Sequence, residues 1–359
     1  MNKKIVFYIP SIEGGGVEKN LYLLIKYLSI KIDKIYIVTA NKKNNTFKKV
    51  EYICPNSNYW DKKSRFLKNI VCIYLFIINF WSSKGLILSF QSNITSILIS
   101  KILRFKVLIR LNTSINKYIN NFIKKMVFKF FYSLSDVIIV NSRFFQKELS
   151  KINLKSHLIF NLNKLDKKRE KLNFFKKFKG LKILNIGRLT DQKDQITIIK
   201  SLKILKKKKI NFKCGIIGRG GYQNILTNEI KRLKLDKNIK LIGFKNNAEK
   251  YISQSDIFVL SSKFEGLPNV LIEAQKYGIP IISSNCPTGP SEILMNGRLG
   301  ELFPVGNFQI LANKLLDFYR NRKKLKKKAS FAKKNLKRFD PITNSKKYYS
   351  LLLKYYEKI

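Results

Sequence analysis

Two glutamates, Glu265 and Glu273, stand eight positions apart in the stretch EGLPNVLIEAQKYGIPIISS. The apolar run before them, 256–261, is expected to be a strand, and residues 269–277 contain good helix formers. Pro268 suits the first turn of such a helix. A loop between a strand and a helix turns backbone N–H groups toward the carboxyl edge of a parallel sheet, where phosphate binds readily. The two glutamates are therefore predicted to face one phosphate-containing ligand from different distances.

A second loop, 187–194 (GRLTDQKD), also follows an apolar run, and it carries two cations, Arg188 and Lys193. Cations at this position can neutralise a diphosphate leaving group, whose negative charge grows as the bond to it breaks. The alternative is that they are two solvated cations among the many in this chain. Their position directly after a strand favours the phosphate interpretation.

A third loop, 11–18 (SIEGGGVE), follows the first expected strand. Its glycines let the backbone approach a ligand closely and adopt positive φ. The loop is neither a G-x-G-x-x-G nor a Walker A sequence, so nicotinamide or ATP binding is not expected.

Paired carboxylates also carry out glycoside hydrolysis, one as acid and one as base or nucleophile. Hydrolases of that kind have no need of several phosphate loops. Carboxylates accept two charge-assisted hydrogen bonds from hydroxyl groups. Beside a diphosphate site, the pair therefore favours binding of the hydroxyls of a sugar and a ribose.

Short apolar runs alternate with helical stretches in both halves of the chain, which is typical of parallel sheets with helices on both faces. The polar, basic stretch 161–180 separates the halves, and the tail 307–359 is expected to be helical with a break near Asp340. This predicts an α/β protein with an N-terminal domain at 1–165, a linker at 166–180, a second domain at 181–335 and a helical segment at 336–359. The expected strands are 4–9, 34–39, 86–90, 107–111 and 136–140 in the first half, and 182–186, 212–217, 239–242, 256–260 and 280–283 in the second.

The chain has 359 residues and a net charge of +50, from 72 Lys+Arg against 22 Asp+Glu. Codon bias explains part of this charge as well as a functional basic surface does, because Lys, Ile, Asn, Phe and Tyr are all abundant. Such a surface attracts polyanions, whether nucleic acid, anionic lipid or a phosphorylated substrate, without choosing among them. The four cysteines show no C-x-x-C spacing, and no signal peptide is recognised, so reduced thiols in a cytosolic protein are expected.

Two apolar stretches bear on membrane contact. The run 70–80 (IVCIYLFIINF) is too short to span a bilayer and is expected to be a buried helix, with membrane contact as the alternative. Residues 115–134 show aromatic and aliphatic side chains at helical spacing, accompanied by lysines. This basic amphipathic pattern fits a helix packed on a core and a helix lying in a membrane interface equally well.

Three segments resemble the retaining glycosyltransferases of family 4, which have the GT-B fold. They are GGGVE near the N-terminus, GRLTDQKD, and EGLPNVLIEA followed by GIPIISSNCPTGPSEIL. The resemblance runs in order and spacing over nearly the whole chain and is strongest from 182 to 305. The E-x7-E signature is its specific part, and the glycine loop only supports it. The resemblance implies two Rossmann-like doubly wound domains facing across a cleft, with the C-terminal helices crossing back to the N-terminal domain.

The resemblance also implies roles for single residues. Glu265 would contact the sugar near its reacting centre as the catalytic residue, and Glu273 would hold the ribose hydroxyls. Arg188 and Lys193 would grip the diphosphate. The other implied donor-binding residues are the backbone of Gly266, Leu267, Pro268, Asn269 and Val270 at the diphosphate, Gly243 and Phe244 at the nucleobase, and Gly15 and Gly16 in the other domain, at the donor phosphate or the acceptor.

The chain departs from the family pattern in two places. Residues 218–221 read GRGG where many members have a GDGP-like segment. Arg219 is expected to alter how the protein contacts the base or the phosphate of the nucleotide. Many members also have a histidine in the N-terminal domain, but the expected place here reads RLNTS, at 110–114. Asn112 or Thr113 is a candidate substitute. The only histidine, His157, is expected to be structural, so the general base stays open.

These features predict a hexosyltransferase that takes a sugar, with an N-acetylhexosamine as one option, from a uridine-linked nucleotide. The acceptor is expected to be a glycan or a polyprenyl-diphosphate-linked sugar in bacterial polysaccharide biosynthesis, such as that of lipopolysaccharide or capsule. No D-x-D pair occurs, so neither metal nor cofactor is expected. The enzyme would be cytoplasmic and peripheral at the inner face of the membrane, bound to anionic lipid and not to nucleic acid. The alternatives are a basic nucleic-acid-binding protein and a same-fold epimerising or phosphorolytic enzyme.

Overall fold

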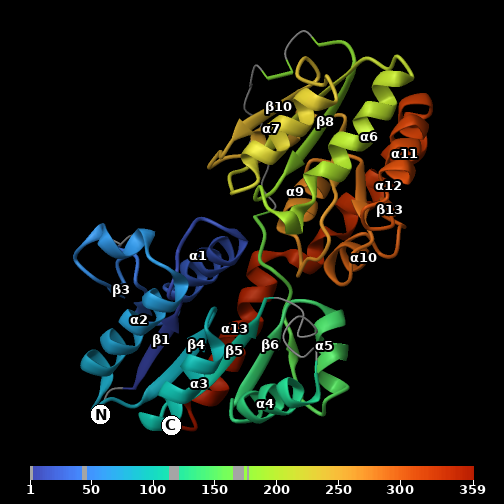
Figure 1. Cartoon of the computed structure of the whole chain (residues 1–359). Coiled ribbons are helices and arrows are strands. Elements are labelled where there is room, and N and C mark those ends of the chain that lie inside the picture. Colours follow the sequence, from blue (N-terminus) through green and yellow to red (C-terminus); the bar gives the residue numbers. More distant parts are fainter. Residues whose placement is uncertain (1–2, 43–46, 113–120, 165–173, 176–177) are drawn as a thin grey trace. The chain divides into compact units, whose positions relative to one another are not determined.

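The computed structural model of the protein describes residues 3–42, 47–112, 121–164, 174–175 and 178–359. The chain forms two compact units, one of residues 1–163 with 339–359 and one of residues 164–338. Each unit is built around one parallel β-sheet with helices packed on it (Figure 1). The linker predicted at 166–180 lies largely outside the described residues.

The sheet of the first unit has seven parallel strands in the order β3-β2-β1-β4-β5-β6-β7. The order reverses direction between β1 and β4, which is the arrangement of a doubly wound sheet. The strands are β1 (Lys4–Tyr8), β2 (Ile35–Val38), β3 (Val50–Ile53), β4 (Gly85–Ser89), β5 (Lys106–Leu111), β6 (Val137–Val140) and β7 (His157–Leu158).

Both faces of this sheet are covered, which explains why its central strands are apolar without alternation. In β1, Ile5 and Phe7 pack with helices α1 and α13, while Val6 and Tyr8 pack on the opposite face with α2, α3 and α4. Helix α13 therefore contributes to the core of the first unit although it ends the chain. The helices are α1 (Gly16–Leu28), α2 (Arg65–Phe80), α3 (Asn93–Ile102), α4 (Phe122–Ser133), α5 (Arg143–Ser150) and α13 (Pro341–Tyr356), with a short 3-10 turn at Asn58–Lys62.

The sheet of the second unit has six parallel strands in the order β10-β9-β8-β11-β12-β13. The direction of winding reverses between β8 and β11. The strands are β8 (Leu181–Ile186), β9 (Phe212–Ile217), β10 (Ile239–Gly243), β11 (Ile257–Leu260), β12 (Ile281–Ser284) and β13 (Glu301–Phe303).

The helices of the second unit begin at side-chain caps where the sequence supplies them. Asp194 accepts a hydrogen bond from the N–H of Thr197 at the start of α6, and Asn307 accepts one from Ile310 at the start of α11. The helices are α6 (Gln195–Lys207), α7 (Gln223–Arg232), α8 (Glu249–Ile252), α9 (Asn269–Lys276), α10 (Gly289–Ile293), α11 (Phe308–Arg320) and α12 (Arg322–Lys334), with 3-10 turns at Asp191–Lys193 and Asn335–Phe339.

All ten predicted strands are present, with ends that shift by one or two residues. The break predicted near Asp340 is confirmed, since Asp340 caps α13. Strands β3, β7 and β13 were not predicted. The helix predicted at 115–134 is described as α4, while residues 113–120 lie outside the described residues.

The expectation that the run 70–80 is a buried helix is only half right. Helix α2 buries Cys72, Phe76 and Phe80 against the sheet, but Tyr74 and Ile78 on its other side are exposed. No helix in the described part of the chain is long and apolar enough to cross a bilayer.

Candidate functional site

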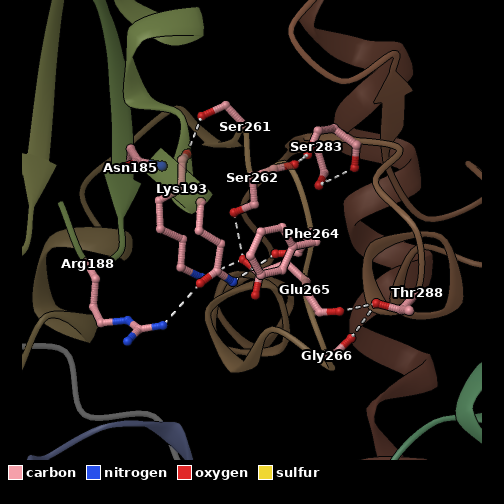
Figure 2. A network of polar contacts seen from close by, with 12 residues as sticks. Asn185, Arg188, Lys193, Ser261, Ser262, Phe264, Glu265, Gly266, Ser283 and Thr288 are labelled. Atoms are coloured by element: carbon pink, nitrogen blue, oxygen red, sulfur yellow. Dashed lines mark hydrogen bonds and ion pairs between the residues drawn. The ribbon is translucent and has the colours of Figure 1, made fainter. Parts of the chain in front are cut away.

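The loops that follow the strands of the second sheet are joined to one another at its carboxyl edge (Figure 2). Leu189 N–H donates to Arg219 O, and Lys263 N–H donates to Gln192 O. The predicted loop 187–194 therefore lies beside both 218–221 and 261–268. Because all strands are parallel, these loops emerge at the same edge, which is where ligands bind in sheets of this kind.

An ion pair between Lys193 and Glu265 lies at the centre of these loops. Lys193 Nζ is 2.5 Å from Glu265 Oε1, and the two side chains are only 14% and 7% exposed. Ser262 Oγ donates to the same Oε1 at 2.6 Å. None of the described residues donates a hydrogen bond to the second oxygen, Oε2. The carboxylate is held in one orientation with one oxygen still able to accept from a hydroxyl group.

The backbone that carries Glu265 is held by the loop after β12. Thr288 Oγ1 donates to Glu265 O and also lies 3.3 Å from Gly266 O. Gly289 N–H donates to Gly266 O at 2.8 Å, and a Cβ at Gly289 would lie 2.0 Å from that oxygen. Only glycine fits this contact, so the segment TGP fixes the segment EGLP.

Arg188 lies at the exposed rim of the same loops. Its Nη2 donates to Gln192 Oε1 at 3.1 Å, and Gln192 Nε2 donates to Phe264 O at 2.9 Å. No carboxylate in the described part of the chain forms an ion pair with Arg188. Its charge is therefore available to an anion brought by a ligand.

Helix α9 adds a positive helix end to this edge. Its N-cap is Pro268, which makes no side-chain capping bond. The N–H groups of a first helical turn and the helix dipole both favour a bound anion. Glu273 lies in the second turn of α9 and is 3% exposed. The two glutamates of the motif thus occupy different elements, one in the loop and one in the helix.

Gly243 ends the edge strand β10, and Phe244 follows it. Gly243 has φ +77°, a conformation that favours glycine. Phe244 is 43% exposed, and the guanidinium carbon of Arg219 lies 4.6 Å from its ring centroid. This cation–π pair presents flat groups that suit stacking on a planar ligand. Arg219 stands in the GRGG segment, where many family members have a GDGP-like segment, and in this structure its guanidinium contacts the ring of Phe244.

Gly15 and Gly16 belong to the first unit, where they start α1. Gly15 is the extended N-cap residue, without a side-chain capping bond, and Gly14 before it has φ +81°. A Cβ at Gly15 would lie 2.9 Å from Glu18 Oε2, so glycine leaves room for that buried carboxylate. The loop is anchored at its base, because Gln91 Nε2 donates to Ser11 O at 2.9 Å.

The position predicted for the family histidine is occupied by a buried polar cluster at the end of β5. Arg110 is 2% exposed and donates to the side-chain oxygens of Asn112 and Asn161. Asn112 Nδ2 donates to Phe90 O at 2.8 Å. An amide held in this way is no general base. Thr113 lies outside the described residues, and His157 is an exposed residue of β7.

The structure brings Arg188, Lys193, Glu265 and Gly266 together, as the sequence predicted. It adds Ser262, Gln192 and Thr288, which the sequence analysis missed. Ser262 could have been noticed because it lies directly after a strand and three residues before Glu265. Thr288 reaches back across more than twenty residues, and no local pattern indicates such a contact. No group of three or more His, Cys, Asp or Glu side chains in the described residues could hold a metal ion.

The fold and the site together define a class of protein. Two doubly wound parallel-sheet units, the second with cationic loops and a glutamate pair at its carboxyl edge, have the architecture of the GT-B fold. The Anabaena protein HepE in complex with UDP-glucose has this architecture, with a TM-score of 0.78. The likeness covers 98% of this chain and 100% of that one at 19% identity. The predicted α/β fold class, with two doubly wound domains, is confirmed.

Residues 166–336 match the family model of "Glycosyl transferases group 1". This span covers almost the whole of the second unit, 164–338. An uncharacterized glycosyltransferase of Methanocaldococcus jannaschii is 35% identical over 51% of this chain and 48% of its own length.

Two bacterial relatives are similar over longer parts of the chain. A Campylobacter jejuni N-acetylgalactosamine-N,N'-diacetylbacillosaminyl-diphospho-undecaprenol 4-alpha-N-acetylgalactosaminyltransferase is 29% identical over 58% of this chain and 60% of its own length. The capsular polysaccharide biosynthesis glycosyltransferase CapH of Staphylococcus aureus is 25% identical over 86% of each chain. The chain thus spans about half the length, 48%, of the Methanocaldococcus relative and 60% of the Campylobacter relative.

Proposed function

We propose that this chain is a retaining glycosyltransferase of family 4. It moves a hexose, with an N-acetylhexosamine as one option, from a uridine diphosphate sugar to a glycan or polyprenyl-diphosphate-linked sugar. The product belongs to bacterial polysaccharide biosynthesis. The observation that carries the proposal is the buried Lys193–Glu265 pair at the carboxyl edge of a sheet, next to a positive helix end.

The comparisons support the parts of this proposal unevenly. The matched family and the relatives described above are all glycosyltransferases by name, which supports the reaction class. The Anabaena structure holds UDP-glucose, which supports a uridine-linked donor. The name of the Campylobacter relative contains a diphospho-undecaprenol acceptor, and that of the Staphylococcus relative contains capsular polysaccharide. These names support the choice of acceptor class.

In this proposal the second unit binds the donor. Phe244 and Arg219 stack on the nucleobase beside Gly243, whose positive φ lets the chain turn there. Glu273 accepts hydrogen bonds from the ribose hydroxyls. Arg188, Lys193 and the N–H groups that follow Pro268 neutralise the diphosphate. As the bond between the anomeric carbon and the diphosphate breaks, the leaving group gains negative charge, and preorganised cations stabilise that charge most strongly.

Glu265 acts on the sugar itself. Its Oε1 is engaged by Lys193 and Ser262, so Oε2 is the oxygen that accepts from a sugar hydroxyl near the reacting carbon. The acceptor hydroxyl forms the new glycosidic bond on the face that the diphosphate leaves, which retains the configuration, and its proton passes to the departing diphosphate. No general base is then needed at Asn112.

The acceptor binds to the first unit, beside the exposed loop of Gly15 and Gly16. We also propose that the enzyme works in the cytoplasm, peripheral at the inner face of the cytoplasmic membrane. Both assignments follow from the expected acceptor. Nuclear magnetic resonance of the product tests the stereochemistry, because a β-linked product from an α-linked donor would contradict retention.

Donor binding is expected to raise the unfolding temperature of the protein. A ligand at 100 times its Kd stabilises the folded state by about 2.7 kcal/mol. A screen of UDP, GDP and dTDP sugars should therefore identify the donor, and Glu273→Ala should need at least about tenfold more of it for the same shift, because hydrogen bonds to a charged group are worth about 1.5–3 kcal/mol. Equal protection of wild type and Glu273→Ala would remove Glu273 from the donor site.

Transfer is expected to continue in EDTA. The roles that a divalent cation has in metal-dependent transferases are assigned here to Arg188, Lys193 and the start of α9. The rate of sugar transfer should change by less than about twofold after EDTA treatment, with added Mg²⁺ as the matched arm. A rate abolished by EDTA and restored by Mg²⁺ would contradict this assignment.

A further inference from the structure

More than half of the large apolar side chains exposed on the described part of the chain lie on three helices of the first unit, α2, α3 and α4. We call this surface the three-helix face. Its apolar members are Phe66, Leu67, Ile70, Tyr74, Ile78 and Trp81 on or just after α2, Ile94, Leu98 and Ile102 on α3, and Phe122, Ile123, Met126, Val127 and Phe130 on α4.

These side chains form stripes on the sides of the helices that face away from the core. In α2 the buried residues are Lys68, Cys72, Phe76 and Phe80, four apart, and the exposed ones lie on the opposite side. In α4 only Phe128 and Tyr132 are buried, while Phe122 is 75% exposed. The helices cover one face of the sheet, and α3 packs against both α2 and α4. Their outward stripes therefore form one continuous surface.

The charge on this surface is mainly positive. No aspartate or glutamate occurs anywhere from residue 62 to residue 135, although the chain has 22 acidic residues. The three-helix face is bordered by exposed cations: Lys62, Arg65, Lys101, Arg104, Lys124, Lys125 and Lys129. Arg65 pairs with Glu13 at 3.7 Å and Asp61 precedes Lys62, so the border is mainly cationic. An apolar surface with a mainly cationic border complements an anionic one.

We propose that the three-helix face docks the protein on an anionic lipid bilayer. Exposed apolar surface of this extent marks an interaction site in a soluble domain. Aliphatic and aromatic side chains insert at the level of the headgroups, Trp and Tyr lie at the boundary, and lysines extend to the lipid phosphates. A protein partner would have to match a broad face with a mainly positive border, whereas a bilayer offers both an apolar layer and a uniform negative surface.

The three-helix face would be the surface that holds the enzyme at the membrane. Only the purpose of this docking, which is to bring the enzyme to a lipid-linked acceptor, rests on the proposed function. The three-helix face also extends the expectation from sequence, which considered membrane contact for the runs 70–80 and 115–134 separately. Those two runs correspond to α2 and α4, whereas the face also includes α3, and α2 and α3 together contribute more exposed apolar side chains than α4 does.

Flotation of the full chain with lipid vesicles tests the proposal. The wild type should float with vesicles of 70% phosphatidylcholine and 30% phosphatidylglycerol at about 0.15 M salt, and much less with pure phosphatidylcholine. Lys124→Gln/Lys125→Gln/Lys129→Gln should bind about a hundredfold more weakly, since each basic residue near such a surface contributes roughly fivefold. Ile78→Ser/Phe122→Gln/Met126→Gln should lose at least about tenfold, because it removes side chains that insert.

A matched control removes three exposed apolar side chains elsewhere, with Ile225→Ser/Phe331→Gln/Ile342→Gln, and should float like the wild type. Circular dichroism and the unfolding temperature check that each variant is folded. Wild-type protein that stays unbound, or folded three-helix variants that bind like the wild type, would overturn the proposal. Light scattering that shows a wild-type dimer, and dissociation of this dimer in Lys124→Gln/Lys125→Gln/Lys129→Gln, would also overturn the proposal, since the face would then bind a second copy of the chain. Flotation measures binding alone, so its failure is distinguishable from a failure of glycosyl transfer.

Discussion

Replacement of Glu265 by alanine is expected to lower turnover by at least about a hundredfold and to leave donor affinity nearly unchanged. One preorganised charged contact to a transition state is worth about 2.7–4 kcal/mol. Glu265 meets this description because Lys193 and Ser262 both hold its Oε1, at 2.5 and 2.6 Å. The carboxylate therefore does not have to be ordered during the reaction. The measurement is kcat and KM with the donor identified by thermal protection.

Glu229→Gln is the matched control for this change. Glu229 is also a paired carboxylate of the second unit, but its partner is Arg232 within α7, away from the loops of the site. Turnover should stay within about twofold of the wild type. Glu265→Gln keeps the shape and the hydrogen bond from Ser262, so it separates loss of charge from loss of packing. A folded Glu265→Ala protein with nearly wild-type turnover would place the reacting centre elsewhere.

The central part of each sheet could be predicted because burial on both faces leaves a plain signature. Strands β1, β4, β8 and β11 are short apolar runs that need partners on two sides. The missed strands, β3, β7 and β13, all lie at a sheet edge. Edge strands are half exposed and here contain Glu51, His157 and Glu301, so their apolar pattern is too weak to recognise.

The site could be predicted as far as chain connectivity determines it. Parallel strands bring the loops that follow them to one edge, so Arg188 and Lys193 were expected near Glu265. The hydrogen bonds that orient the carboxylate could not be predicted, because they depend on side-chain positions. Thr288 and Gly289 hold the EGLP segment from the loop after β12 and the start of α10, and the exclusion of any Cβ at Gly289 appears only in three dimensions.

The three-helix face shows a different limit of sequence reasoning. Helix α2 is apolar on almost every side, so its periodicity does not indicate which side faces the sheet. The contacts of Cys72 and Phe76 with the core decide this, and they leave Tyr74 and Ile78 exposed.

Replacement of Lys193 by methionine is expected to have two effects of different origin. Turnover should fall by at least about a hundredfold, because a cation that neutralises the leaving diphosphate is lost. The protein should also lose about 3 kcal/mol of stability or more, because Glu265, at 7% exposure, would keep its charge without its partner. The measurements are kcat and the unfolding temperature of the same preparation.

The double variant Lys193→Met/Glu265→Gln separates these effects. With both charges removed, most of the lost stability should return, since the cost of an unpaired buried charge disappears. Turnover should remain at least a hundredfold below wild type, because neither group then acts on the donor. Lys276→Met is the matched control, as it breaks the ion pair of the buried Lys276 with Glu249 at 2.6 Å, in which the glutamate is more exposed, at 25%. It should lower the unfolding temperature while turnover stays high. If the double variant regained turnover together with stability, Lys193 would act only by holding the fold, and the diphosphate would have to be neutralised by other groups.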